Sequence, residues 1–301
     1  MNMNEYLMEF TRFYCGDSRE TAVNYRRIAK EFCETTMENR GWTMDELVEN
    51  ASKRDILIFM DALEQRGLSP HSINFYVSAV STLFTYLGEF DYRTGANPCA
   101  NVKRANTDGV EQKAEYLTED EYANLLTAIG IRTAKARKFE FTSARDKLLV
   151  TLNLTVGLRC SEALGLTVEQ FNNDIISVVG KGGKRRSFKV TDEVRDRFNE
   201  YMQVRSMAFS DDQEDCGLLF LSVTGKGLHT KDVNKQLKRY CERANIAKDI
   251  TSHALRRSCV TRYLNDGVPV AQVSKLVGHS VTATTMRYFK ADSSEFDFLG
   301  L

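Results

Sequence analysis

The stretch I-I-S-V-V-G-K-G-G-K-R-R-S-F-K-V, residues 175 to 190, carries the clearest strand pattern in this 301-residue chain. Its first five residues are mostly β-branched, a glycine-rich turn follows at 180–183, and residues 184–190 alternate in character. Two such runs around a short turn that contains glycine predict a β-hairpin. Most of the remaining sequence has apolar residues at helical spacing. The sequence therefore predicts a mainly α fold with a small β-sheet.

Residues 1–104 are expected to form an all-helical domain. Ser52 is suited to begin one helix, which Gly67 would stop. The Ser-Pro pair that ends at Pro70 is suited to begin the next, which Gly88 would end. Proline in the first turn and glycine after the last turn follow the usual asymmetry of helix ends.

A small and polar stretch follows this helical half, and we place an interdomain linker at residues 105–115. The second domain is predicted at 116–301, with a C-terminal tail at 289–301. It is expected to be mixed α/β and mostly helical. Thr118 and Glu121 have the spacing of a capping box, which predicts that a helix begins there.

The composition is that of an ordinary globular protein, with 42% hydrophobic residues, 27% charged residues and a formal net charge of zero. Seven cysteines without a C-x-x-C pair, and only four histidines, argue against a disulfide framework and against a zinc site. No apolar run approaches the roughly 20 residues of a membrane span. The first residues lack the features of a secretory signal. Cytoplasmic residence is therefore expected.

Basic residues gather locally although the chain as a whole is neutral. Residues 181–189 carry five basic side chains and no acidic one, residues 226–243 carry six against two, and residues 251–290 carry six against one. A local basic surface is compatible with DNA binding, because only the contacted face must match the phosphates. Solvated helix faces are the alternative for each stretch taken alone. The predicted DNA contacts are Lys184, Arg185, Arg186, Arg257, Lys231 and Lys235.

Helical periodicity from Ala144 to Leu166 includes the segment T-V-G-L-R-C-S-E-A-L-G-L, residues 155 to 166. Arg159 begins a short helical segment there. A guanidinium beside a helix N-terminus suits bidentate binding of a phosphate, and Glu162, one turn further on, is placed to orient it. The alternative is a surface arginine whose stem covers its apolar neighbours.

Further groups with acid–base chemistry lie towards the C-terminus. Lys181 occupies the hairpin turn, and His253 and Arg256 lie three residues apart on a predicted helix, so both project from one face. The segment G-H-S-V-T-A-T-T-M-R-Y then adds His279 and Tyr288. An arginine, two imidazoles and a phenol are the groups needed to attack a DNA phosphodiester covalently. Packing is the alternative for Tyr288, because the chain has twelve tyrosines.

Together these positions resemble the catalytic signature of the tyrosine recombinases, the phage-integrase family. The matching motifs are G-L-R-x-S-E at 157–162, the hairpin lysine, H-x-x-R, G-H and the later tyrosine, in the family's order. Residues 68–87 are similar to the family's core-binding domain, and N-P-C-A-N-V-K at 97–103 resembles its interdomain joint. The resemblance covers nearly the whole chain. Arg257 departs from it, because many relatives have a histidine there.

The resemblance implies that Tyr288 attacks a backbone phosphate, forms a 3′-phosphotyrosyl link and releases a 5′-hydroxyl. Arg159 and Arg256 would neutralise the phosphate oxygens. Lys181 would be the general acid, His253 the proton acceptor and His279 a hydrogen-bond donor to the phosphate. Glu162 would orient its neighbours from outside the reacting groups. The same resemblance implies that neither a metal nor a nucleotide cofactor is needed.

The implied partners are a double-stranded DNA recombination site and three further copies of the chain, which exchange strands through a Holliday junction. Residues 293–301 are expected to dock on a neighbouring copy. The biological outcome stays open between integration and excision, inversion, and resolution of DNA. Two alternative functions also remain at this point, a type IB topoisomerase and a catalytically silent DNA-binding regulator.

Overall fold

The computed structural model describes residues 2–13, 19–107, 115–132, 138–180, 183–209 and 216–278. The chain divides into two compact units, Met1–Val110 and Glu111–Leu301, each with its own hydrophobic core. Most of the predicted linker lies outside the described residues, so the domain bounds stay predictions. In the described part, no helix is long and apolar enough to cross a bilayer.

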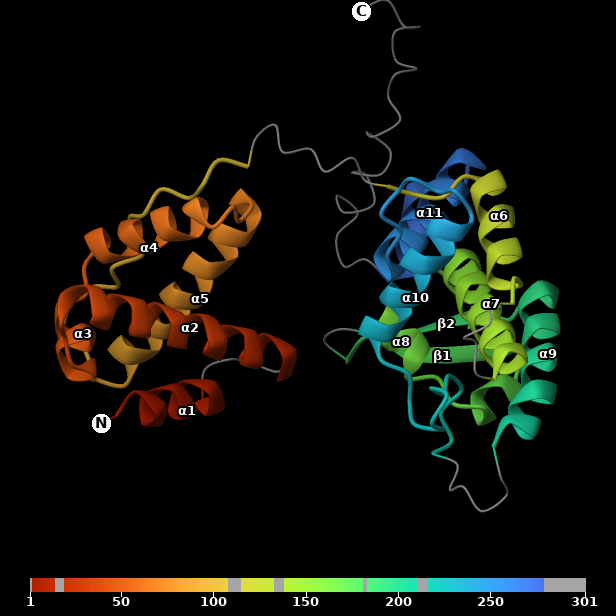
Figure 1. Ribbon diagram of the computed structural model, residues 1–301, viewed down its shortest axis with the longest axis horizontal. Helices are drawn as coiled ribbons and strands as arrows, with labels where there is room; N and C mark the ends of the chain where they lie inside the picture. Colours follow the sequence, from red (N-terminus) through yellow and green to blue (C-terminus); the bar gives the residue numbers. More distant parts are fainter. Residues whose placement is uncertain are drawn as a thin grey trace, which may run out of the picture. The chain divides into compact units, whose positions relative to one another are not determined.

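The described residues of unit 1 form helices joined by turns and irregular segments, without a β-strand (Figure 1). Its helices are α1 (Met3–Phe13), α2 (Arg19–Arg40), α3 (Met44–Asn50), α4 (Lys53–Gln65) and α5 (Pro70–Glu89). The predicted starts of α4 after Ser52 and of α5 at Pro70 are confirmed. The predicted end of α5 at Gly88 is wrong. The Phe90 N–H still bonds the Tyr86 carbonyl at 3.1 Å, and the left-handed turn falls at Asp91.

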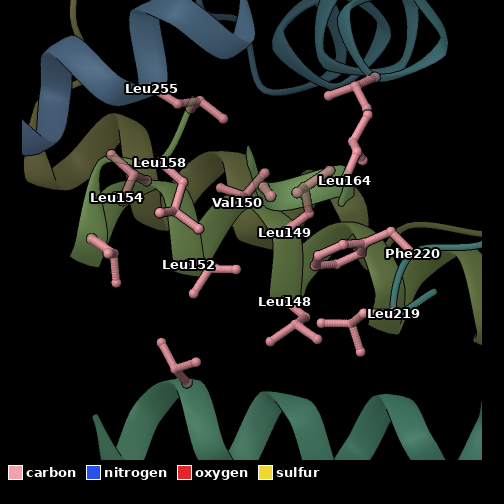
Figure 2. Close-up of a cluster of buried hydrophobic side chains, with 14 of the residues drawn as sticks. Leu148, Leu149, Val150, Leu152, Leu154, Leu158, Leu164, Leu219, Phe220 and Leu255 are labelled. Carbon is pink, nitrogen blue, oxygen red and sulfur yellow. The ribbon is translucent and has the colours of Figure 1, made fainter. Parts of the chain in front are cut away.

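Unit 2 surrounds one long helix. Its helices are α6 (Glu119–Ile129), α7 (Phe139–Val156), α8 (Cys160–Leu164), η1 (Glu169–Asn172), α9 (Asp192–Ala208), α10 (Thr230–Arg243), α11 (Ser252–Asn265) and α12 (Val270–Val277). α7 packs against both α9 and α11 (Figure 1). Figure 2 shows its leucines gathered in one apolar cluster with Leu219, Phe220 and Leu255. The capping box that begins α6 is present, with the Thr118 N–H 2.8 Å from Glu121 Oε2.

The predicted hairpin is confirmed as two antiparallel strands, β1 (Ile175–Val179) and β2 (Arg185–Lys189). Ile176 pairs with Phe188, and both are buried. Because side chains alternate between the two faces of a strand, Arg186 lies on the same inward side, opposite Val178. One basic side chain of the hairpin is thereby directed into unit 2.

A left-handed residue separates α7 from α8 within the stretch 144–166, where helical periodicity and the start of a short helical segment at Arg159 were expected. Gly157 has φ +63°, and its N–H bonds the Asn153 carbonyl at 2.9 Å. A Cβ at Gly157 would lie 2.8 Å from Val277 Cγ1 and 3.1 Å from Cys259 Sγ. Only glycine permits both this backbone conformation and this close approach of α11 and α12.

We predict that Gly157→Ala lowers the free energy of unfolding of unit 2 by about 2–5 kcal/mol. The left-handed backbone accounts for about 1–2 kcal/mol of this and overpacking for about 1–3 kcal/mol. Denaturant unfolding followed by far-UV circular dichroism measures the loss. Fluorescence of Trp42, the single tryptophan, reports separately on unit 1.

Gly267→Ala is the matched control, because Gly267 has φ +78° and no atom within 4 Å of its Cβ position. It should lose only the backbone contribution of about 1–2 kcal/mol. Equal losses for the two variants would contradict the proposed close approach at Gly157.

Candidate active site

Several of the predicted site residues converge in unit 2. Arg159 stands directly before α8, Glu162 lies on α8, and His253 and Arg256 lie on α11. Arg186, predicted only as a DNA contact, joins them from β2. The remaining three predicted catalytic residues lie outside the described residues, and their roles stay predictions: Lys181, His279 and Tyr288.

Glu162 is the centre of this cluster. Its Oε1 accepts a hydrogen bond from Arg159 Nη1 at 2.8 Å, and its Oε2 accepts one from Arg186 Nη2 at 2.7 Å. Arg256 Nη1 lies 4.0 Å from the same Oε2. Burial alone would raise the pKa of this carboxyl, but hydrogen bonds from the Arg159 backbone N–H and from Arg186 hold its pKa below its usual range. The carboxylate therefore stays ionised and orients the guanidiniums around it.

The same three arginines bond three consecutive carbonyls at the end of α12. Arg186 Nη1 donates to the carbonyl of Leu276, Arg256 Nη2 to that of Val277 at 2.5 Å, and Arg159 Nη2 to that of Gly278 at 3.3 Å. The last carbonyls of a helix have no partner within the helix and carry partial negative charge. Here the guanidiniums donate hydrogen bonds to these carbonyls and offset their negative charge. They also connect α12 to the cluster around Glu162.

The arginines differ in their access to solvent. The side chain of Arg159 is 32% exposed, whereas that of Arg256 is 5% exposed. Arg256 Nη1 also donates to the Gly157 carbonyl at 2.7 Å, so the turn after α7 helps to hold it. Arg159 is thus the more accessible guanidinium of this pair.

The hairpin backbone runs directly beside this pair of side chains. A Cβ at Gly180 would lie 3.2 Å from Glu162 Oε1 and 3.6 Å from Arg159 Nη1. Gly180 immediately precedes Lys181 in the sequence. The absence of a side chain at position 180 therefore leaves room for the Arg159–Glu162 pair next to the hairpin turn.

His253 lies in the first turn of α11, next to several cations. His253 is exposed as a residue, but the protein atoms around its imidazole remove part of the solvent and lower its pKa, and the positive charges of Arg257, Arg256 and Arg159 lower that pKa further. The imidazole is therefore neutral at neutral pH. A neutral imidazole is the form that accepts a proton.

The other predicted DNA contacts lie on the surface of unit 2. Lys184 and Arg185 on the hairpin, and Lys231 and Lys235 on α10, are exposed, and Arg257 is half-buried. Their contact with DNA stays a prediction.

Sequence reasoning missed the internal bonds of Arg186. The available signal was its register, two residues before the buried Phe188. The described residues contain no group of three or more His, Cys, Asp or Glu placed to hold a metal ion.

We predict that Arg257→Gln raises the pKa of His253 towards its ordinary value, because it removes one of the charges that disfavour the imidazolium. The rise should be partial, since loss of solvent is the larger cause. Proton NMR titration measures it, and the chain has only four histidines to assign. Arg262→Gln, on the same helix, should leave the titration of His253 in place. An unchanged pKa in Arg257→Gln would contradict this electrostatic account.

Comparison with known proteins identifies the family of this chain. The model of the phage integrase family matches residues 115–295. A tyrosine recombinase of Thermosipho africanus is 30% identical over 260 residues, which cover 83% of this chain and 84% of that protein. Tyrosine recombinase XerC of Lactobacillus delbrueckii subsp. bulgaricus is 24% identical over 296 residues, which cover 96% of this chain and 94% of that protein.

Among solved structures, a lambda integrase tetramer bound to a Holliday junction has the same fold. Its TM-score is 0.69 at 14% identity, over 96% of this chain and 77% of that one. The family match spans more than half of the chain and includes the arginine cluster around Glu162. The chain therefore belongs to the phage integrase family and is a tyrosine-type site-specific DNA recombinase.

Proposed function

We propose that this chain recombines DNA by using Tyr288 as the nucleophile at a phosphate bound by Arg159 and Arg256. The observation that supports the proposal is the cluster of guanidiniums around Glu162. Three guanidinium charges against one carboxylate charge leave a net charge of +2 at the cluster. A phosphodiester carries one negative charge and gains more as its phosphorus is attacked, so such a cluster stabilises the transition state.

The proposed cleavage step transfers the phosphoryl group to the protein. Tyr288 Oη attacks phosphorus, its proton passes to His253, and the bond from phosphorus to the 5′ oxygen breaks. Lys181 delivers a proton to that leaving oxygen, and His279 donates a hydrogen bond to the phosphate. A phenol has a pKa of about 10, so a neutral acceptor and nearby cations are needed to make it nucleophilic. The lowered pKa of His253 keeps its imidazole in the neutral form, which can accept the proton.

The phosphotyrosyl link retains the energy of the broken bond, so religation to another strand needs no cofactor. Exchange between two duplexes then requires four copies of the chain at a double-stranded DNA site. The lambda integrase of similar fold was solved as a tetramer on a Holliday junction, which supports this assembly. We propose that unit 1 contributes the core-binding contacts to DNA and unit 2 the chemistry.

Two other functions share part of this description. A type IB topoisomerase uses the same covalent link, and a silent regulator binds DNA without cleaving it. The relatives named above are recombinases, so neither alternative is favoured.

We predict that Tyr288→Phe abolishes formation of a covalent protein–DNA adduct, because the phenylalanine ring has no oxygen to attack phosphorus. The substrate is a nicked duplex that carries the site selected by the wild-type chain from a randomised DNA pool, and denaturing electrophoresis detects the adduct. Tyr122→Phe is the control, because the Tyr122 hydroxyl bonds Thr151 and Glu193 away from the cluster. An adduct with Tyr288→Phe, or none with the wild type, would overturn the proposal.

We predict that deletion of residues 293–301 weakens assembly of four chains on DNA and leaves binding to a single half-site unchanged. The segment carries four large apolar residues, Phe296, Phe298, Leu299 and Leu301. Each such side chain contributes about 1.5–3 kcal/mol when it is fully buried against a neighbour. Light scattering and gel mobility of synaptic complexes measure assembly. Equal assembly by the truncated and full-length chains would exclude a docking role for this segment.

A further inference from the structure

We propose that Arg186 is a positioning residue for the cleavage reaction. It holds Glu162 and the end of α12 in place, and thereby orients Arg159 without touching DNA itself. This inference rests on the proposed function, because its readout is the cleavage step.

The position of Arg186 on the hairpin separates it from its basic neighbours. Arg185 and Lys184 are exposed, whereas the side chain of Arg186 is 11% exposed on the inward side of β2. Its register partner, Val178, is buried. A charged group removed from water in this way requires compensating partners.

Both terminal nitrogens of Arg186 already bond protein oxygens. Nη2 lies 2.7 Å from Glu162 Oε2, and Nη1 donates to the carbonyl of Leu276. Its Nε is buried and has no hydrogen-bond partner among the described residues. These contacts direct the guanidinium into the protein, so a primary role as a phosphate contact does not fit them.

Through Glu162, Arg186 acts on Arg159. The carboxylate uses Oε1 for Arg159 and Oε2 for Arg186, so bonds on both oxygens fix its orientation. Without Arg186, Oε2 would retain the Arg159 backbone N–H and the more distant Arg256 Nη1 at 4.0 Å. If the carboxylate then rotated towards Arg256, the hydrogen bond from Arg159 Nη1 to Glu162 Oε1 would weaken, and the Arg159 guanidinium would lose its present orientation.

Arg186 also packs against the residue at which α12 ends. Gly278 has φ +69°, and a Cβ there would lie 3.0 Å from Arg186 Cδ and 3.2 Å from its Nε. The stem of Arg186 thus lies directly beside the left-handed turn, one residue before His279 in the sequence. The side chain of Arg186 therefore fixes the position of the Glu162 carboxylate, which orients Arg159, and also the position of the end of α12.

The experiment measures single-turnover adduct formation by the full-length chain on the nicked duplex described above, at saturating protein. Arg186→Gln should slow the step about 100-fold, the scale expected when reacting groups are misplaced by about 1 Å. The protein concentration at half-saturation should stay near that of the wild type. Arg186→Lys should give an intermediate rate, because one ammonium does not span two partners as a planar guanidinium does.

Arg197→Gln is the matched control. Arg197 pairs with Glu200 at 3.1 Å on the surface of α9, so its removal also breaks an arginine–glutamate pair but touches no site residue. Its cleavage rate should equal that of the wild type. Circular dichroism gives the folded fraction of each variant, and every rate is divided by that fraction.

A double-mutant cycle with Glu162→Gln tests the route of action. If Arg186 acts through Glu162, the double variant should be no slower than the slower single variant, because coupled residues are not additive. A phosphate contact would give a different result: the rate losses of the two single variants would multiply, DNA binding would weaken, and the slope of binding against salt concentration would fall by about one unit. That result would overturn the proposal. Slowing fully explained by the unfolded fraction would also overturn it. Failure of the wild type to form an adduct would instead refute the proposed function.

Discussion

Glu162 has only 3% of its side chain exposed and is nevertheless ionised, and the partners that this requires determine how unit 2 is built around it. A buried carboxylate costs several kcal/mol unless nearby charges and hydrogen bonds compensate it. Arg159, Arg186 and Arg256 provide that compensation from the start of α8, from β2 and from α11. In return, the carboxylate allows three cations to lie close together, and the cluster keeps a net positive charge.

The end of α12 is the second negative partner of these arginines. Three successive carbonyls each accept a hydrogen bond from one guanidinium, so the end of α12 is bonded to the same arginines as Glu162. Gly157 makes this possible, because a larger residue would separate α12 from the turn after α7. The backbone conformation at Gly157, the polar carbonyls at the end of α12 and the charges of the arginines thus all determine how the three guanidiniums are held. A change in any one of them is expected to reach the orientation of Arg159.

Much of the local structure could be predicted because its causes lie within a few residues. The capping box at Thr118, the Ser-Pro start of α5 and the hairpin around 180–183 depend on turn and cap chemistry that a short window contains. The predicted end of α5 at Gly88 was wrong because Gly88 lies inside the last hydrogen-bonded turn of the helix. The start of a short helical segment at Arg159 was predicted, but the reason for glycine at position 157 was not, because it lies in the approach of Val277 and Cys259, which are distant in sequence.

By itself, the sequence determined the fold class, the family and the residue types available for the chemistry, because motif spacing and periodicity are local properties of the chain. The tertiary structure decided which side chains meet. Arg185 and Arg186 are adjacent in sequence and chemically equal, yet one is exposed and the other bonds Glu162 and α12. The physical reason is that strand register and packing direct one guanidinium inward, where burial requires partners that lie 24 and 90 positions away.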